Sequence, residues 1–123
     1  MELADLQAYL FTKQRVTEET PFGPDALVYK VKGKMFALVA WNSNPLSISL
    51  KCNPAKARAL RAEFAAIKPG YHLNKEHWNT VTLDGSVPPA LVEMMIDDSY
   101  ALVVRNLPKS ERTDLTAPPV SRP

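Results

Sequence analysis

The side chains best suited to chemistry gather in one segment, residues 71–79, which reads YHLNKEHWN. Aromatic rings alternate there with cations and amides. Rings that stack on bases, beside lysines and amides that bond phosphates and base edges, are what a nucleic-acid surface needs. The segment therefore predicts contact with a nucleic acid, and we assign base or sugar contacts to His72, His77 and Asn79.

The same segment has a structural interpretation. Tyr71 and Trp78 are large enough to belong to the core with their polar atoms satisfied. Asn74 and Asn79 are of the type that bonds the backbone of an irregular turn. We expect the two aromatic residues in the core, whereas His72, Lys75 and His77 are expected to be exposed.

Charge is unevenly distributed, although the net charge is only +2, from 15 basic and 13 acidic residues. Residues 51–79 hold six basic and two acidic residues, and residues 84–99 hold four acidic residues and no basic one. The resulting +4 segment could neutralise several phosphates, with binding that falls steeply as salt rises. The alternative is that its cations are the solvated face of a helix. Phosphate contacts are predicted for Lys51, Arg58, Arg61, Lys68 and Lys75.

Catalytic and metal sites are not indicated. His72 and His77 lie five residues apart, which is not the helical spacing of the HExxH zinc motif, and the single cysteine, Cys52, lies twenty residues before His72. The four glycines are isolated, so the sequence has no glycine-rich loop to hold a phosphate. We therefore expect no enzyme, no metal and no cofactor. A small-molecule enzyme that uses His72 or His77 stays a third hypothesis.

The sequence also limits the compartment. A single cysteine excludes an intrachain disulfide, which fits a reducing environment. The longest apolar run, residues 35–41, has seven residues, against about 20 for a bilayer-spanning helix. The first residues are acidic and patterned, unlike a secretory signal. We expect a cytoplasmic protein without membrane contact.

Three helices are expected to position these residues. Leucines recur at helical spacing in residues 3–13. Asn53 and Pro54 are an N-cap and a first-turn proline, and Ala57, Leu60, Phe64 and Ile67 would form the buried stripe of that helix. A last helix follows Pro88 and Pro89, with a broad apolar face over residues 91–103.

Strands are expected between the helices, at residues 27–31, 35–41 and 46–51, with two short pieces within residues 71–83. The order is α-β-β-β-α-β-β-α. Short connections force neighbouring strands to be antiparallel, so we predict an α+β two-layer sandwich with helices against an antiparallel sheet. With 123 residues, 46% of them apolar, the chain fits one domain. We place that domain at residues 1–107 and expect the polar, proline-rich tail at 108–123 to be mobile.

Several segments also occur, in the same order, in a known family: PFGPD at 21–25, VYKV at 28–31, KMFAL at 34–38, SLKC at 49–52, PGYHLNKEHWNTV at 69–81 and DSY at 98–100. They resemble the MmcQ/YjbR family over nearly all of residues 3–107. The resemblance implies a compact α+β domain similar to the fold of type III secretion chaperones. It also implies DNA binding, through likeness to a double-wing motif whose concave sheet sits on the duplex.

Two classes of function follow, because a fold does not by itself determine function. The first is a DNA-binding domain that contacts the phosphate backbone through a basic surface. The second is a chaperone-like adaptor for proteins that binds no nucleic acid. The adaptor predicts a homodimer or protein partner, and an exposed apolar patch of several hundred Å² on the sheet or on residues 91–103. The most useful single observation is whether the five predicted phosphate contacts fall on one concave face or scatter.

Overall fold

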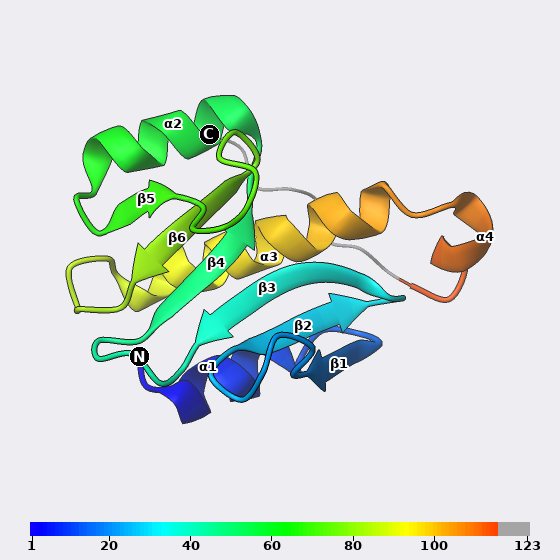
Figure 1. The fold of residues 1–123 in the computed structure, drawn as a ribbon. Helices are drawn as coiled ribbons and strands as arrows, with labels where there is room; N and C mark the ends of the chain where they lie inside the picture. Colours follow the sequence, from blue (N-terminus) through cyan, green and yellow to red (C-terminus); the bar gives the residue numbers. More distant parts are fainter. Residues whose placement is uncertain (116–123) are drawn as a thin grey trace.

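The computed structural model describes residues 1–115, which form four helices and six strands (Figure 1). The helices are α1 (Leu3–Leu10), α2 (Pro54–Glu63), α3 (Pro89–Arg105) and α4 (Lys109–Arg112). The strands are β1 (Val16–Glu19), β2 (Leu27–Val31), β3 (Lys34–Ala40), β4 (Ser47–Lys51), β5 (Ile67–Pro69) and β6 (Trp78–Thr82). The predicted α+β architecture is confirmed, and the structure adds β1 and α4 to the predicted order. Of the two short strands expected within residues 71–83, only β6 lies there, and β5 lies before that range.

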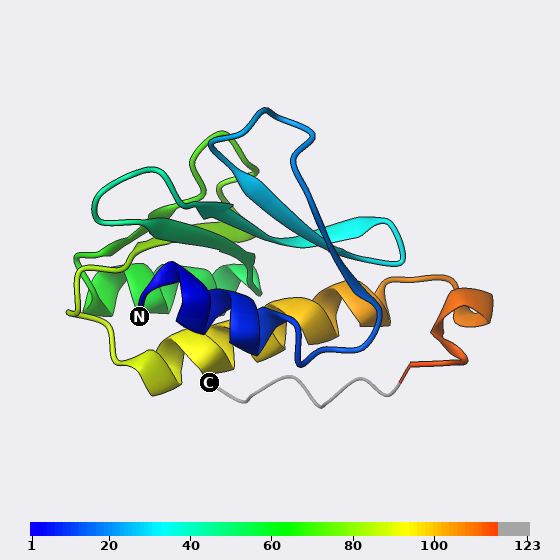
Figure 2. The ribbon, with the colours of Figure 1, turned by 90° about the horizontal axis from the view of Figure 1, so that it is seen from below.

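The strands form one antiparallel sheet in the order β1-β2-β3-β4-β6-β5. Helices α1, α2 and α3 lie against one face (Figure 2). No helix of residues 1–115 covers the opposite face, which we call the open face. Two loops, residues 20–26 and 70–77, rise on that side (Figure 2). The short outer strands leave little unpaired backbone at the sheet edges.

Helix α2 begins as the sequence predicts and ends earlier. The Asn53 side chain accepts hydrogen bonds from the amides of Ala55 (3.0 Å) and Lys56 (3.4 Å). The predicted continuation through Phe64 and Ile67 is wrong: Phe64 is already extended, and Ile67 is the first residue of β5. The early end lets β5 pair with β6, which buries Ile67 on the helix side.

Two consecutive side chains of α3, Asp98 and Ser99, fix this helix to its neighbours. Asp98 is buried and accepts a hydrogen bond from Lys56 Nζ of α2 at 2.9 Å. The Ser99 hydroxyl is fully buried, donates to the Phe36 carbonyl of β3 and accepts from the Lys51 amide of β4. It bridges the two strands directly beyond their last paired residues.

The next residue, Tyr100, reaches a third part of the molecule. Its hydroxyl donates to the Gln14 carbonyl, in the segment after α1, at 2.7 Å. Its ring meets the ring of Phe36 edge to face, with the centroids 5.3 Å apart. The DSY segment of α3 is therefore the point at which both other core helices and the central strands are joined.

The chain after Leu107 makes specific contacts as far as it is described. Asp114 accepts a hydrogen bond from Lys32 Nζ at 3.0 Å and forms an ion pair with Arg15. The Lys32 bond holds the pKa of the Asp114 carboxyl below its usual range. Leu115 packs against the core. These contacts tie residues 108–115 to the β2–β3 hairpin, and the rest of the predicted tail, residues 116–123, lies outside the described residues.

Removing the Ser99 hydroxyl should destabilise the fold. Ser99→Ala leaves the Phe36 carbonyl and the Lys51 amide without their buried partner, which costs about 1–3 kcal/mol of the free energy of unfolding. Urea denaturation monitored by circular dichroism measures this. Ser110→Ala, at an exposed position on α4, is the matched control and should change stability by less than about 0.5 kcal/mol. Equal effects of the two substitutions would contradict the bridging role.

The Cys52 thiol should be inert in the folded protein. Cys52 is 6% exposed, and burial raises the pKa of its thiol. Because the thiolate is the reactive form, alkylation by iodoacetamide near neutral pH should be slow under native conditions and fast in denaturant. Mass spectrometry over time measures both rates, and similar rates in the two conditions would refute the prediction.

Candidate nucleic-acid interface

The loop of residues 70–77 is held at its start by a close approach of two backbones. The Gly70 amide donates to the Trp78 carbonyl at 2.8 Å, and the Gly70 carbonyl accepts from the Leu73 amide and from Lys75 Nζ. A Cβ at position 70 would lie 2.7 Å from Trp78 Cβ. Only glycine fits there without a shift of the backbone.

A second turn within the loop is closed by Asn74, whose side-chain oxygen accepts from the amides of Glu76 (2.9 Å) and His77 (3.2 Å). This is the structural role considered for Asn74 from the sequence. His72 lies in the left-handed backbone region, with φ of 59°. The loop is thus fixed by its own backbone and short polar side chains, which leaves the larger side chains free to face solvent.

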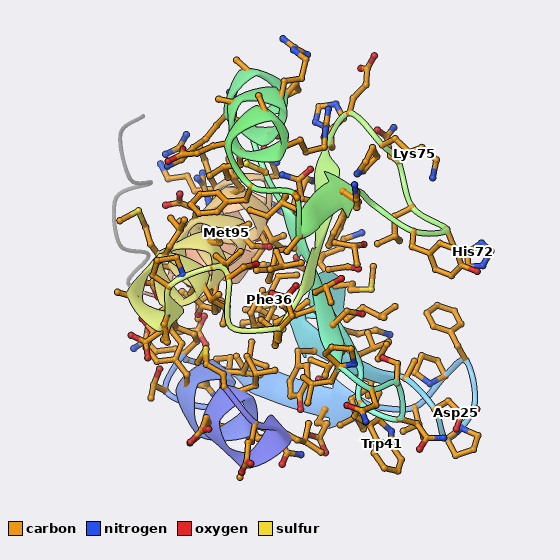
Figure 3. All side chains as sticks on the ribbon, turned by 90° about the vertical axis from the view of Figure 1, so that its left-hand side faces the viewer. Asp25, Phe36, Trp41, His72, Lys75 and Met95 are labelled. Atoms are coloured by element: carbon orange, nitrogen blue, oxygen red, sulfur yellow. The ribbon has the colours of Figure 1, made fainter. Side chains whose placement is uncertain are left out.

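The position of Lys68 follows from strand register. Lys68 of β5 pairs with Thr80 of β6, so both side chains point to the open face. The Thr80 hydroxyl bonds that of Ser49 at 2.7 Å and accepts from the Tyr71 amide at 3.0 Å. Lys68 therefore lies beside the start of the loop. Figure 3 shows His72 and Lys75 on the same side of the sheet, away from the helices. We define the basic–aromatic surface as Lys68, Tyr71, His72 and Lys75.

Tyr71 and Trp78 were both expected in the core, which is wrong for Tyr71 and holds in part for Trp78. Tyr71 is 72% exposed, because its amide is fixed to Thr80 and its side chain leaves the sheet. Trp78 is half-buried on the open face. His72, Lys75 and His77 are exposed, as expected. His77 lies at the end of the loop, where its carbonyl accepts from the Cys52 amide.

The prediction that Asn79 contacts a base or sugar is wrong. It is fully buried and faces α2, where its amide donates to the Ala57 carbonyl at 3.3 Å. Its oxygen accepts from Arg61 at 2.7 Å, and Arg61 also donates to the Lys75 carbonyl. Arg61 therefore bridges α2, β6 and the loop, and its guanidinium is engaged within the protein.

The five predicted phosphate contacts do not share one face. Lys68 and Lys75 belong to the open face. Arg58 is exposed on α2, in the layer behind the sheet. Lys51 pairs with Trp78, so its side chain also belongs to the open face by register, where it lines a separate cavity of about 280 Å³ with Lys34 and the C-terminal end of α3. Lys68 and Lys75 are thus the two predicted cations that adjoin the start of the loop.

Ion pairing reduces the charge contrast seen in the sequence. In the basic segment, Lys56 is paired with the buried Asp98. In the acidic segment, Asp97 is paired with Lys13 and accepts a hydrogen bond from the Tyr9 hydroxyl. Burial and this bond raise the pKa of Tyr9 well above its ordinary value. Within residues 1–115, Lys51, Arg58, Lys68 and Lys75 form no ion pair.

A cleft of about 350 Å³ lies on the open face between the two loops, and its walls are mostly apolar. The sequence does not indicate this cleft, because Phe22 stands out there only as part of the PFGPD segment. A large aromatic residue between two prolines is the one local sign that Phe22 could be exposed. Phe22 is 70% exposed. The cleft is lined by Phe22, Ala26, Leu38, Ala40, Tyr71, His72 and Leu73.

The described residues offer no metal centre and no membrane span. No group of three or more His, Cys, Asp or Glu side chains in residues 1–115 could hold a metal ion. None of the helices in that range is both long and apolar enough to pass through a bilayer. The chemistry available at the open face is that of cations, aromatic rings and one imidazole.

Comparison with solved structures finds the same fold in proteins of Deinococcus radiodurans and Pseudomonas syringae. The crystal structure of Deinococcus radiodurans protein DR2400, a DUF419 domain, matches with a TM-score of 0.89 and 41% identity, over 95% of this chain and 89% of that one. A crystal structure of a Pseudomonas syringae protein matches with a TM-score of 0.72 and 29% identity, over 83% and 98% of the two chains.

Sequence comparison gives the family. The uncharacterised protein YjbR of Escherichia coli K12 is 35% identical over 112 residues, 91% of this chain and 95% of the relative. The uncharacterised protein YbdF of Escherichia coli O157:H7 is 39% identical over 92 residues, 75% of each chain. The YjbR family model matches residues 11–102, which include the loop and the DSY segment. This chain therefore belongs to the YjbR family.

Proposed function

We propose that this protein binds DNA at its open face through the basic–aromatic surface. The observation that carries the proposal is the combination of Tyr71, 72% exposed on a loop held by its own hydrogen bonds, with two cations beside it. Lys68 forms no ion pair in the described chain. Lys75 uses one of its three N–H donors on the Gly70 carbonyl, which leaves two for a phosphate.

The fixed loop supports binding for an energetic reason. An exposed side chain on a mobile loop must be ordered when a ligand binds, and that ordering costs free energy. Here Gly70 and Asn74 order the backbone during folding. The ring and the ammonium groups are therefore presented without that additional cost.

The number of available cations also sets the expected affinity for DNA and its dependence on salt. Each phosphate contact contributes about 0.9 to the salt dependence of binding, so Lys68 and Lys75 together give a slope of about 2. The five cations predicted from the sequence would give more than twice that. We therefore propose weak binding, measurable at low salt, that is not specific for sequence.

The surface also supports a binding role over catalysis. His72 is the one imidazole that lines the cleft, and its neighbours there are apolar apart from the Tyr71 hydroxyl. General acid–base chemistry needs a second polar group within reach of the same substrate atom. A cytoplasmic location is part of the proposal, supported by the buried free thiol of Cys52.

A protein-interaction adaptor is the second candidate, and the apolar cleft favours it. The expected apolar patch on residues 91–103 is not available, because Val92, Met95, Ile96 and Val103 are buried against the sheet and only Met94 is substantially exposed. The patch for an adaptor would instead be the cleft between Phe22 and Tyr71. It lies on the sheet, which was the other place expected for it.

Replacing Lys68 should weaken DNA binding and its salt dependence together. We expect fluorescence anisotropy with labelled duplex to show that Lys68→Ala lowers the slope of log affinity against log salt by about 1. The loss should be similar for unrelated sequences, because a phosphate contact reads no base. Lys109→Ala, on exposed α4, removes the same charge elsewhere and should leave the slope unchanged.

Two results would count against this function. One is an equal loss in both lysine variants, which would mean that only total charge matters. The other is absence of binding to duplex and single strands at low salt and about 100 μM protein, the weak end of ordinary non-specific affinity.

A further inference from the structure

The cleft on the open face combines features that rarely occur together on a surface without a ligand. Two large aromatic side chains, Phe22 and Tyr71, are 70% and 72% exposed at its walls. Apolar surface that is exposed and contiguous marks binding sites, whereas single exposed apolar residues do not. Figure 3 shows the two loops that carry Asp25 and His72 projecting from the same side of the sheet.

The size of the cleft restricts its occupant. Its volume is about 350 Å³, at the lower end of the range for small-molecule pockets, about 300–1,000 Å³. Leu38 and Ala40 of β3 line it from the sheet, and Ala26 and Leu73 line it from the loops. A space of this size with apolar surroundings holds a ring-sized group. It is too small for a helix of a partner protein.

The residues around the cleft favour a nucleic-acid base over an apolar peptide side chain as its occupant. Tyr71 and His72 form a tilted ring pair with centroids 4.0 Å apart, a surface suited to stacking. The Tyr71 amide and Lys68 both adjoin Thr80, so a cation lies next to the aromatic wall. An apolar side chain could pack on the ring faces but would not use the ammonium groups. A nucleotide, an aromatic ring joined to an anion, uses both.

We propose that the cleft holds one unstacked base of single-stranded DNA, in contact with Phe22 and Tyr71, while Lys68 and Lys75 bind the adjoining phosphates. This inference rests on the proposed function and makes it more specific. In a duplex both faces of each base are already stacked, so a base must leave the helix before it can enter the cleft. The protein should therefore bind single strands more tightly than the corresponding duplex.

The test is anisotropy with a labelled single strand and its duplex, using the whole chain. Phe22→Ala and Tyr71→Ala should each weaken single-strand binding by about tenfold, the usual effect of removing one stacked ring, and leave the salt slope unchanged. Met94→Ala removes a side chain that is 41% exposed on α3 and should have no effect. Because Phe22 and Tyr71 are largely exposed, thermal melting should confirm that their variants fold.

Conservative variants separate stacking from simple apolar contact. Tyr71→Phe keeps the ring and should bind like the wild type, whereas Phe22→Leu keeps apolar volume without a ring face and should bind like Phe22→Ala. Full binding by Phe22→Leu would overturn the base-stacking proposal, since an apolar pocket alone would then suffice.

The remaining outcomes distinguish a failure of this inference from a failure of the proposed DNA binding. Equal binding to both nucleic acids, lowered by Lys68→Ala but unaffected by Phe22→Ala and Tyr71→Ala, would overturn the inference and leave DNA binding standing. Absence of binding to either nucleic acid would overturn both. Preference for the single strand, lost in the two alanine variants, would support both.

Discussion

Helix α3 is joined to the rest of the molecule by Asp98, Ser99 and Tyr100, each of which bonds a different partner. The Ser99 hydroxyl stands where a direct bond between β3 and β4 would otherwise form, so the helix completes the ladder of the sheet. These bonds lie in a low-dielectric interior, where a polar group without a hydrogen-bond partner lowers the free energy of unfolding. In the described residues no buried side-chain nitrogen or oxygen lacks a partner. The arrangement therefore fixes one position of α3 on the sheet.

The position of α3 on the sheet determines which face of the sheet is left for a ligand. With α1, α2 and α3 on one face (Figure 2), Asp98 of the acidic segment is buried, and Asp97 and Asp98 are paired with Lys13 and Lys56. The same packing directs Asn79 toward α2 and engages Arg61. Four of the charged side chains in the two segments, Lys56, Arg61, Asp97 and Asp98, thus bond within the fold. What remains for a ligand is the opposite face, where two loops stand on either side of an apolar cleft.

The sequence allowed prediction of features that depend on a few neighbouring residues. The Asn53 cap of α2 and the strand expected at residues 46–51 depend on local sequence, and both are confirmed, the strand as β4. The face of the sheet to which each of residues 78–82 points depends on pairing with β4, which is distant in the chain. Asn79 was therefore predicted to contact a ligand, although it is buried. β1 was missed because an edge strand buries little, and its sequence VTEE is accordingly polar. The cleft could not be predicted, since it needs two loops about fifty residues apart to meet across β3.

The exposure of Tyr71 follows from the same close contact that requires glycine beside it. Gly70 brings the loop backbone against Trp78, leaving no room even for a Cβ. Trp78 itself is half-buried on the open face beside the loop. The amide of Tyr71 is held by Thr80, which fixes the backbone from which the ring projects. An aromatic side chain directed to solvent by its own backbone loses little conformational freedom when a ring stacks on it, which is why a loop built in this way suits recognition better than one that must first become ordered.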